Sequence, residues 1–146
     1  MPGVRRFEDL EVYKLAAQLR VEVVTLSSSG AVARDYKFVD QIRDAARGAP
    51  RNIAEGFARC APLEFHQFLS YAKASVDETK NHLYDGHESG YITSDERDRL
   101  VTLARRTAAA IMRLMRYLES PEAQRAYARM RKRVRTKQSG SRTPEL

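Results

Sequence analysis

Apolar side chains recur every three or four residues through most of the chain, and this period predicts α-helices. No stretch shows the two-residue alternation that is typical of a half-buried strand. Prolines, glycines and capping residues divide the pattern into four long helices. We expect these helices to run from a cap at Asp9 to about Leu26, from about Tyr36 to Ala58, from about Pro62 to Glu88, and from the capping box Thr93–Glu96 to about Leu118.

The first predicted helix carries two apolar rows, so a broad buried face is expected. Its valines would also suit a strand, but the run from Lys14 to Arg20 favours a helix. The two rows are Leu10, Tyr13, Ala17, Val21 and Val24, and Val12, Ala16, Leu19 and Val23.

The stretch from Gln41 to Arg59 keeps its apolar register although it contains Gly48 and Pro50. Proline removes a backbone donor and clashes with the carbonyl four residues earlier, at a cost of ~3 kcal/mol inside a helix. Because the register continues through Pro50, we predict one kinked helix, with two helices joined by a turn as the alternative. The small residues at positions 45, 46, 48 and 49 would let another helix pack closely.

Two polar residues, Asn52 and Glu55, lie within the next five positions after the proline. They either bind a ligand or partner, or they satisfy backbone groups that Pro50 leaves without a hydrogen bond. We favour the second interpretation, with the Asn52 amide donating to the Ala46 carbonyl. Glu55 can also pair with arginines four residues away on either side.

The predicted helices are joined by short connections, so the fold class is all-α: an up-down-up-down four-helix bundle with a basic C-terminal extension. The bundle occupies residues 7–119 and follows a flexible N-terminus, residues 1–6. Ser120 and Pro121 predict the start of a short basic helix over residues 120–137. Residues 138–146 are expected to form a disordered tail.

The net charge of +7 at pH 7 lies almost wholly in the C-terminal extension. From Pro121 onward eight Arg and Lys residues stand against two Glu, whereas residues 1–120 hold eighteen basic and seventeen acidic groups. A basic tail of this kind favours contact with nucleic acid or an anionic surface. The single cysteine fits a reducing, cytoplasmic location. We expect neither a signal peptide nor a membrane span, because no run approaches ~20 apolar residues.

Three groups of basic residues are candidate phosphate contacts. The alternatives are a salt-bridge ladder with Asp40, Asp44 and Glu55 on the second helix, and a merely solubilising tail. The candidates are Arg43, Arg47 and Arg51 on the second helix, Arg105, Arg106, Arg113 and Arg116 on the fourth, and Arg125, Arg129, Arg131, Lys132, Arg133, Arg135 and Lys137 in the tail.

The sequence offers little for catalysis or metal binding. A di-iron bundle needs Glu-x-x-His pairs, and none occurs. Glu78, His82 and Asp85 share one helix face, where surface salt bridges and hydrogen bonds are the favoured interpretation. We therefore predict no catalytic residue, no metal and no cofactor.

Several segments, in their order along the chain, resemble the bacterial four-helix-bundle family encoded in intervening sequences (IVS) of large-subunit ribosomal RNA genes. The resemblance covers about residues 7–118 and includes Pro50, Asn52, Glu55, Gly56 and Glu78 as structural motif residues. The segments are Phe7 to Tyr13, Gln41-Ile42-Arg43 with Ala45-Ala46, Pro50 to Phe57, Glu64-Phe65, Phe68-Leu69, Ala72 with Ser75, Glu78, and Gly90-Tyr91-Ile92.

The resemblance implies a bundle that assembles as a ring-like homopentamer and has no known enzymatic activity. The chain is similar, more distantly, to the accessory protein of diversity-generating retroelements, a basic pentamer that binds a reverse transcriptase and nucleic acid. Arg47, Gly48, Arg51 and Thr79 depart from the family pattern: Arg47 and Arg51 make the region around Pro50 more basic, and Thr79 weakens the core locally. The tail beyond Pro121 lies outside the resemblance.

These observations together favour a non-catalytic oligomeric scaffold that binds RNA or DNA with low sequence specificity. The alternative is a protein-only adaptor that recruits a protein partner through the oligomeric ring.

Overall fold

The computed structural model describes residues 3–141, and every regular element within this range is helical. The all-α prediction is confirmed. No helix in this range combines the length and the apolar character that a membrane crossing needs. The elements are η1 (Phe7–Asp9), α1 (Glu11–Leu26), η2 (Val32–Arg34), α2 (Tyr36–Ala58), α3 (Pro62–Glu88), α4 (Ser94–Glu119) and α5 (Pro121–Gly140), where η denotes a 3-10 helix.

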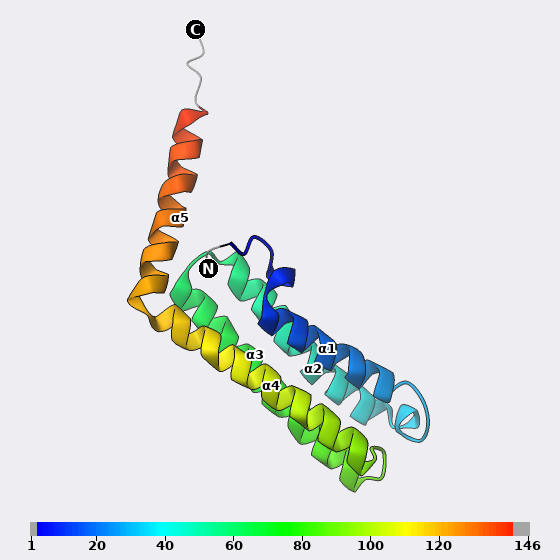
Figure 1. Cartoon of the computed structure of the whole chain (residues 1–146). Coiled ribbons are helices and arrows are strands. Elements are labelled where there is room, and N and C mark those ends of the chain that lie inside the picture. Colours follow the sequence, from blue (N-terminus) through cyan, green and yellow to red (C-terminus); the bar gives the residue numbers. More distant parts are fainter. Residues whose placement is uncertain (1–2, 142–146) are drawn as a thin grey trace.

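Helices α1 to α4 lie side by side and alternate in direction, and α5 points away from them (Figure 1). Helix α2 packs against α1 and α3, and α4 packs against α3 and α1. Helix α5 meets α4 and α3 near its first turns. We refer to α1–α4 as the body of the molecule.

The core runs along the centre of the body and is formed by large apolar side chains from all four helices. On α1 the row containing Leu19 and Val23 faces this core. In the other row Leu10, at the N-cap, is 3% exposed and Tyr13 packs against the core, whereas Val21 is 59% exposed. The broad buried face predicted for α1 is therefore present only near its start, where Phe7 of η1 packs on Tyr13. The fully buried side chains include Phe65, Leu19, Ile42, Ile53, Leu69, Leu83, Leu100, Ile111 and Leu118.

Helix α2 continues through Pro50 as one helix, and the two-helix alternative is ruled out. The small residues around the proline are buried against α3. A Cβ placed on Gly48 would lie 2.3 Å from Ser75 Oγ, and one on Gly56 would lie 2.7 Å from Phe68 Cβ. The two helices therefore approach each other more closely than any side chain at these positions would allow.

The Asn52 amide donates a hydrogen bond to the Gly48 carbonyl at 2.8 Å. The prediction that the Ala46 carbonyl is the acceptor was wrong, because the observed acceptor lies two residues later in the chain. A helical side chain lies over the turn that precedes it, so it reaches the carbonyl four residues earlier and not the one six residues earlier. The interpretation that Asn52 serves the helix backbone agrees with this bond.

Two further helix ends differ from the predictions. Asp9 does not cap α1: it lies in the turn Phe7–Asp9, and Leu10 occupies the N-cap position without a side-chain hydrogen bond. Helix α5 extends to Gly140, so residues 138–140 are helical, not disordered. Between Pro121 and Gly140 the sequence contains no further proline or glycine that would end α5. Ser139 Oγ also donates a hydrogen bond to the Thr136 carbonyl at 3.1 Å. Residues 1–2 and 142–146 of the expected flexible ends lie outside the described range.

The predicted caps of α4 and α5 are present. The Glu96 amide donates to Thr93 Oγ1 and the Thr93 amide donates to Glu96 Oε1, both at 3.1 Å, which completes the capping box. The Ala123 amide donates to Ser120 Oγ at 3.2 Å, with Pro121 at the first helical position.

One carboxylate joins the connections at one end of the body. Asp35 caps α2 by accepting from the Phe38 amide at 3.1 Å, and it also accepts from the Tyr91 hydroxyl at 2.8 Å. The bond from the Phe38 amide, followed by that from Tyr91, lowers the pKa of Asp35, and the bond to Asp35 raises the pKa of Tyr91. The α1–α2 connection is thereby tied to the α3–α4 connection.

The close α2–α3 contact leads to a stability prediction. We expect Gly56→Ala to lower the urea midpoint, because overpacking costs about 1–3 kcal/mol and the Phe68 Cβ cannot easily move. The matched control is Gly140→Ala on α5, where nothing lies within 4 Å of the added Cβ. A Gly56→Ala protein at least as stable as the Gly140→Ala protein would contradict the packing described here.

Candidate nucleic-acid interface

Helix α5 is the strongest candidate because it is anchored at its start and exposed along the rest of its length. Ser120 has an extended backbone, with φ −76° and ψ 151°, and this sets the direction in which α5 leaves the body. Ala123 and Tyr127 are buried and hold the first two turns. Burial, with smaller effects from Tyr117 and Cys60, raises the pKa of the Tyr127 hydroxyl.

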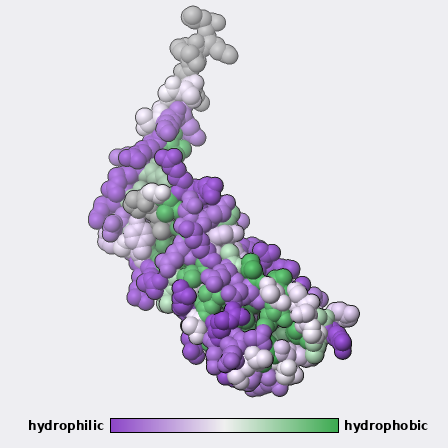
Figure 2. All heavy atoms as spheres, turned by 45° about the vertical axis from the view of Figure 1, so that its right-hand side comes forward, coloured by the Kyte–Doolittle hydropathy of each residue, from purple (hydrophilic) through white to green (hydrophobic). Residues whose placement is uncertain are grey.

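The basic residues of α5 are all exposed, and hydrophilic side chains cover most of the helix in Figure 2. Its one acidic residue is Glu122, in the first turn. Within residues 3–141 no carboxylate lies within ion-pair distance of any of these cations. Their positive field is therefore uncompensated along the helix. The residues are Arg125, Arg129, Arg131, Lys132, Arg133, Arg135 and Lys137.

The predicted arginine face on α2 is divided by the structure. Arg43 is held by α1: its Nε donates to Ser27 Oγ at 2.8 Å, and its Nη2 donates to Ser28 Oγ at 3.0 Å and to the Val24 carbonyl at 3.3 Å. A cation suits the end of a helix, where carbonyls lack partners. Arg43 therefore serves the fold, in contrast to its predicted role as a phosphate contact.

Arg47 and Arg51 are exposed on the same helix. Of the predicted salt-bridge ladder, the structure forms one ion pair, between Glu55 and Arg59 at 2.7 Å. The Arg59 guanidinium also lies 5.0 Å from the centre of the Phe68 ring. Arg47 and Arg51 consequently remain available as phosphate contacts.

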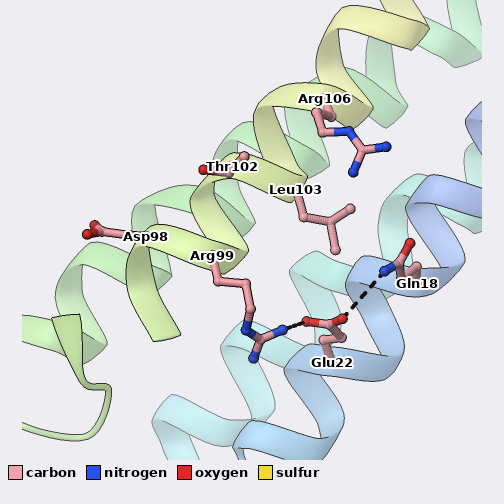
Figure 3. Close-up of a pocket in the computed structure, with 7 residues that line it drawn as sticks. All are labelled: Gln18, Glu22, Asp98, Arg99, Thr102, Leu103 and Arg106. Carbon is pink, nitrogen blue, oxygen red and sulfur yellow. Dashed lines mark hydrogen bonds and ion pairs between the residues drawn. The ribbon is translucent and has the colours of Figure 1, made fainter. Parts of the chain in front are cut away.

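The predicted arginines of α4, Arg105, Arg106, Arg113 and Arg116, are all exposed. Arg106 borders a hollow of about 470 Å³ between α1 and α4 (Figure 3). In this hollow Glu22 accepts from Arg99 and, at 3.5 Å, from Gln18. The pairing of Glu22 with Arg99 was not anticipated from the sequence, because the two residues lie 77 positions apart.

The five motif residues that carry the family resemblance are buried, bonded to the backbone or paired with a nearby side chain. Pro50 is buried within α2, Gly56 lies against Phe68 of α3, and Asn52 bonds to the backbone of its own helix. Glu55 pairs with Arg59, and Glu78 lies 3.6 Å from His82 on the surface.

No group of three or more His, Cys, Asp or Glu side chains within residues 3–141 could hold a metal ion. His66, which the sequence left unassigned, bonds through Nε2 to the Glu119 carboxylate at 2.7 Å and so links the start of α3 to the end of α4. Cys60 is exposed in the α2–α3 connection.

A family model described as 23S rRNA-intervening sequence protein matches residues 8–113. The match covers η1 to most of α4 and leaves α5 outside. No curated protein matches the sequence significantly.

The contrast between Arg43 and Arg47 is testable by substitution. We expect Arg43→Ala to destabilise the fold by about 1–3 kcal/mol, because it removes the three hydrogen bonds that join α2 to the end of α1. Arg47→Ala should change stability by no more than about 0.5 kcal/mol, since its side chain is exposed. Urea unfolding measures both, and equal stabilities of the two variants would show that Arg43 has no structural role.

Proposed function

This chain belongs to the 23S rRNA-intervening sequence protein family, and we propose that it is a non-catalytic helical-bundle protein that binds RNA or DNA with low sequence specificity. In this proposal α1–α4 form an up-down-up-down four-helix bundle, and α5 is a basic extension that contacts phosphate. The family description names a ribosomal RNA intervening sequence, and the support for nucleic-acid binding comes from the surface of α5.

The observation that carries the proposal is the row of seven exposed cations, without an ion pair to any carboxylate of residues 3–141, on a helix that stands clear of the body. Three arginines of the body have local partners: Arg43 binds α1, Arg59 binds Glu55, and Arg99 binds Glu22. Cations without protein partners are free to neutralise phosphates and to release counterions.

Low specificity follows from the kind of contact that α5 can make. Lys and Arg contacts to phosphate position a protein on nucleic acid but carry no sequence information. Secondary contacts are proposed for Arg47 and Arg51 on α2, and for Arg105, Arg106, Arg113 and Arg116 on α4, which are exposed. These residues would extend the phosphate path beyond α5.

The proposal predicts salt-dependent binding that is lost with α5. A structured RNA and a DNA duplex should both shift in an electrophoretic mobility assay at low salt, and the affinity should fall steeply as salt rises. A chain that ends at Ala128 should lose most of this binding, because it keeps the anchors Ala123 and Tyr127 but lacks six of the seven cations.

The matched control removes two exposed cations from α1, with Lys14→Gln and Arg20→Gln, and should bind nearly as the parent does. Full binding by the shortened chain would refute the role of α5. An absence of binding at low salt, with a protein that co-purifies stably, would instead favour the protein-only adaptor.

We also propose that the biological unit is an oligomer, with the homopentamer implied by the family resemblance as the specific expectation. Exposed Val21, Tyr36 and Leu63 are apolar or aromatic surface that a neighbouring subunit could cover. Several copies of α5 in one assembly would raise the apparent affinity for a long nucleic acid, because later contacts form within one complex.

Light scattering coupled to size-exclusion chromatography tests the assembly. We expect a mass of five times the 16.7 kDa of one chain at micromolar concentration. A mass of one chain under these conditions would refute the oligomer, and another multiple would correct the stoichiometry.

A further inference from the structure

A groove lies in the corner where α5 turns away from the α2–α3 connection, and we refer to it as the corner groove. It encloses about 660 Å³ between Cys60 of the connection and the side of α5 that follows Tyr127. Its apolar lining includes Met130, 39% exposed, and Val134, 52% exposed. Three cations border it: Arg131, Lys132 and Arg135. The groove thus combines an apolar floor with a strongly positive rim.

An aromatic cluster on the body includes Arg59, the residue before Cys60. The Phe68 ring lies between the Arg59 guanidinium, 5.0 Å from its centre, and the Tyr71 ring, 5.9 Å away at an angle of 89°. Tyr71 is 49% exposed, so one large ring on α3 remains available to solvent. Arg59 directly precedes Cys60, so the cluster begins one residue before the groove lining along the chain.

We infer that the corner groove and the Arg59–Phe68–Tyr71 cluster together bind single-stranded nucleic acid in preference to a duplex. This inference rests on the proposed function and narrows its substrate class. A single strand presents unstacked bases, and these stack on exposed aromatic rings and on guanidinium planes. A duplex hides its bases and can use the cations alone.

The surroundings of the groove favour a polyanion with apolar faces over the other occupants. The phosphates of a single strand would follow Arg131, Lys132 and Arg135, and its bases would face Met130, Val134 and the Tyr71 ring. A second α5 in the same groove would bring three like charges against three, which is unfavourable. The Glu55 carboxylate holds Arg59 at 2.7 Å and so keeps its guanidinium over Phe68.

Fluorescence anisotropy with labelled RNA of about 15 nucleotides tests the inference, with the single strand and a duplex of the same sequence as separate probes. We expect the full chain to bind the single strand more tightly at equal salt. Tyr71→Ala should weaken single-strand binding roughly 5- to 100-fold, as the loss of base stacking does elsewhere, and leave duplex binding unchanged. Tyr71→Phe should retain the affinity, because it keeps the ring.

The matched control is Tyr84→Ala, which removes another exposed tyrosine, 38% exposed, from α3 on a different part of its surface. This variant should bind both probes as the parent does. Equal affinities for the two probes, or no effect of Tyr71→Ala, would overturn the inference and leave the proposed function intact. An absence of salt-dependent binding to either probe would refute both.

Two further outcomes would assign the groove to another occupant. Competition by poly-glutamate as effective as that by unlabelled single-stranded RNA would show a general polyanion surface without base contacts. A fall in oligomer mass on Met130→Glu, with RNA binding unchanged, would show that a second copy of the chain covers the groove. Either result would overturn the inference.

Discussion

The close contact between α2 and α3 is the constraint on which the rest of the structure depends. At Gly48 and Gly56 the helices approach within the space that a Cβ would occupy. This contact fixes the antiparallel register of the pair, so that Arg59 meets Phe68 and the connection with Cys60 lies beneath α5. Pro50 is buried within the continuous helix α2, where surrounding tertiary packing offsets the lost backbone donor.

Charge is distributed unequally between the body, α1–α4, and the extension, α5. Three arginines of the body have partners within it: Arg43 binds the end of α1, Arg59 pairs with Glu55, and Arg99 pairs with Glu22 across the α1–α4 contact. The cations of α5 lie beyond the reach of the body's carboxylates. The composition makes the body near-neutral and α5 strongly positive, and the geometry keeps the α5 cations exposed and away from the body. Helix α5 is therefore the part suited to a polyanion.

Sequence periodicity predicted the bounds of α2 and α3, because their apolar rows are long and proline marks the start of α3. It also predicted the capping box of α4, whose residues are only three positions apart. Features that depend on tertiary register were not predictable in this way. Arg43 was considered for phosphate binding or a salt-bridge ladder, and its bonds to the end of α1 were missed, because its distance from that end appears only after folding. The Arg59–Phe68–Tyr71 cluster was missed for the same reason.

The central claim is that α5 is the surface that meets nucleic acid. Hydrogen–deuterium exchange of the full chain, with and without single-stranded RNA at low ionic strength, tests it most directly. The backbone amides of α5 beyond its buried anchors are exposed to solvent, so bound RNA should slow their exchange, and the core of α2 and α3 should be unchanged. Exchange that stays the same in α5 while RNA is bound would contradict the account.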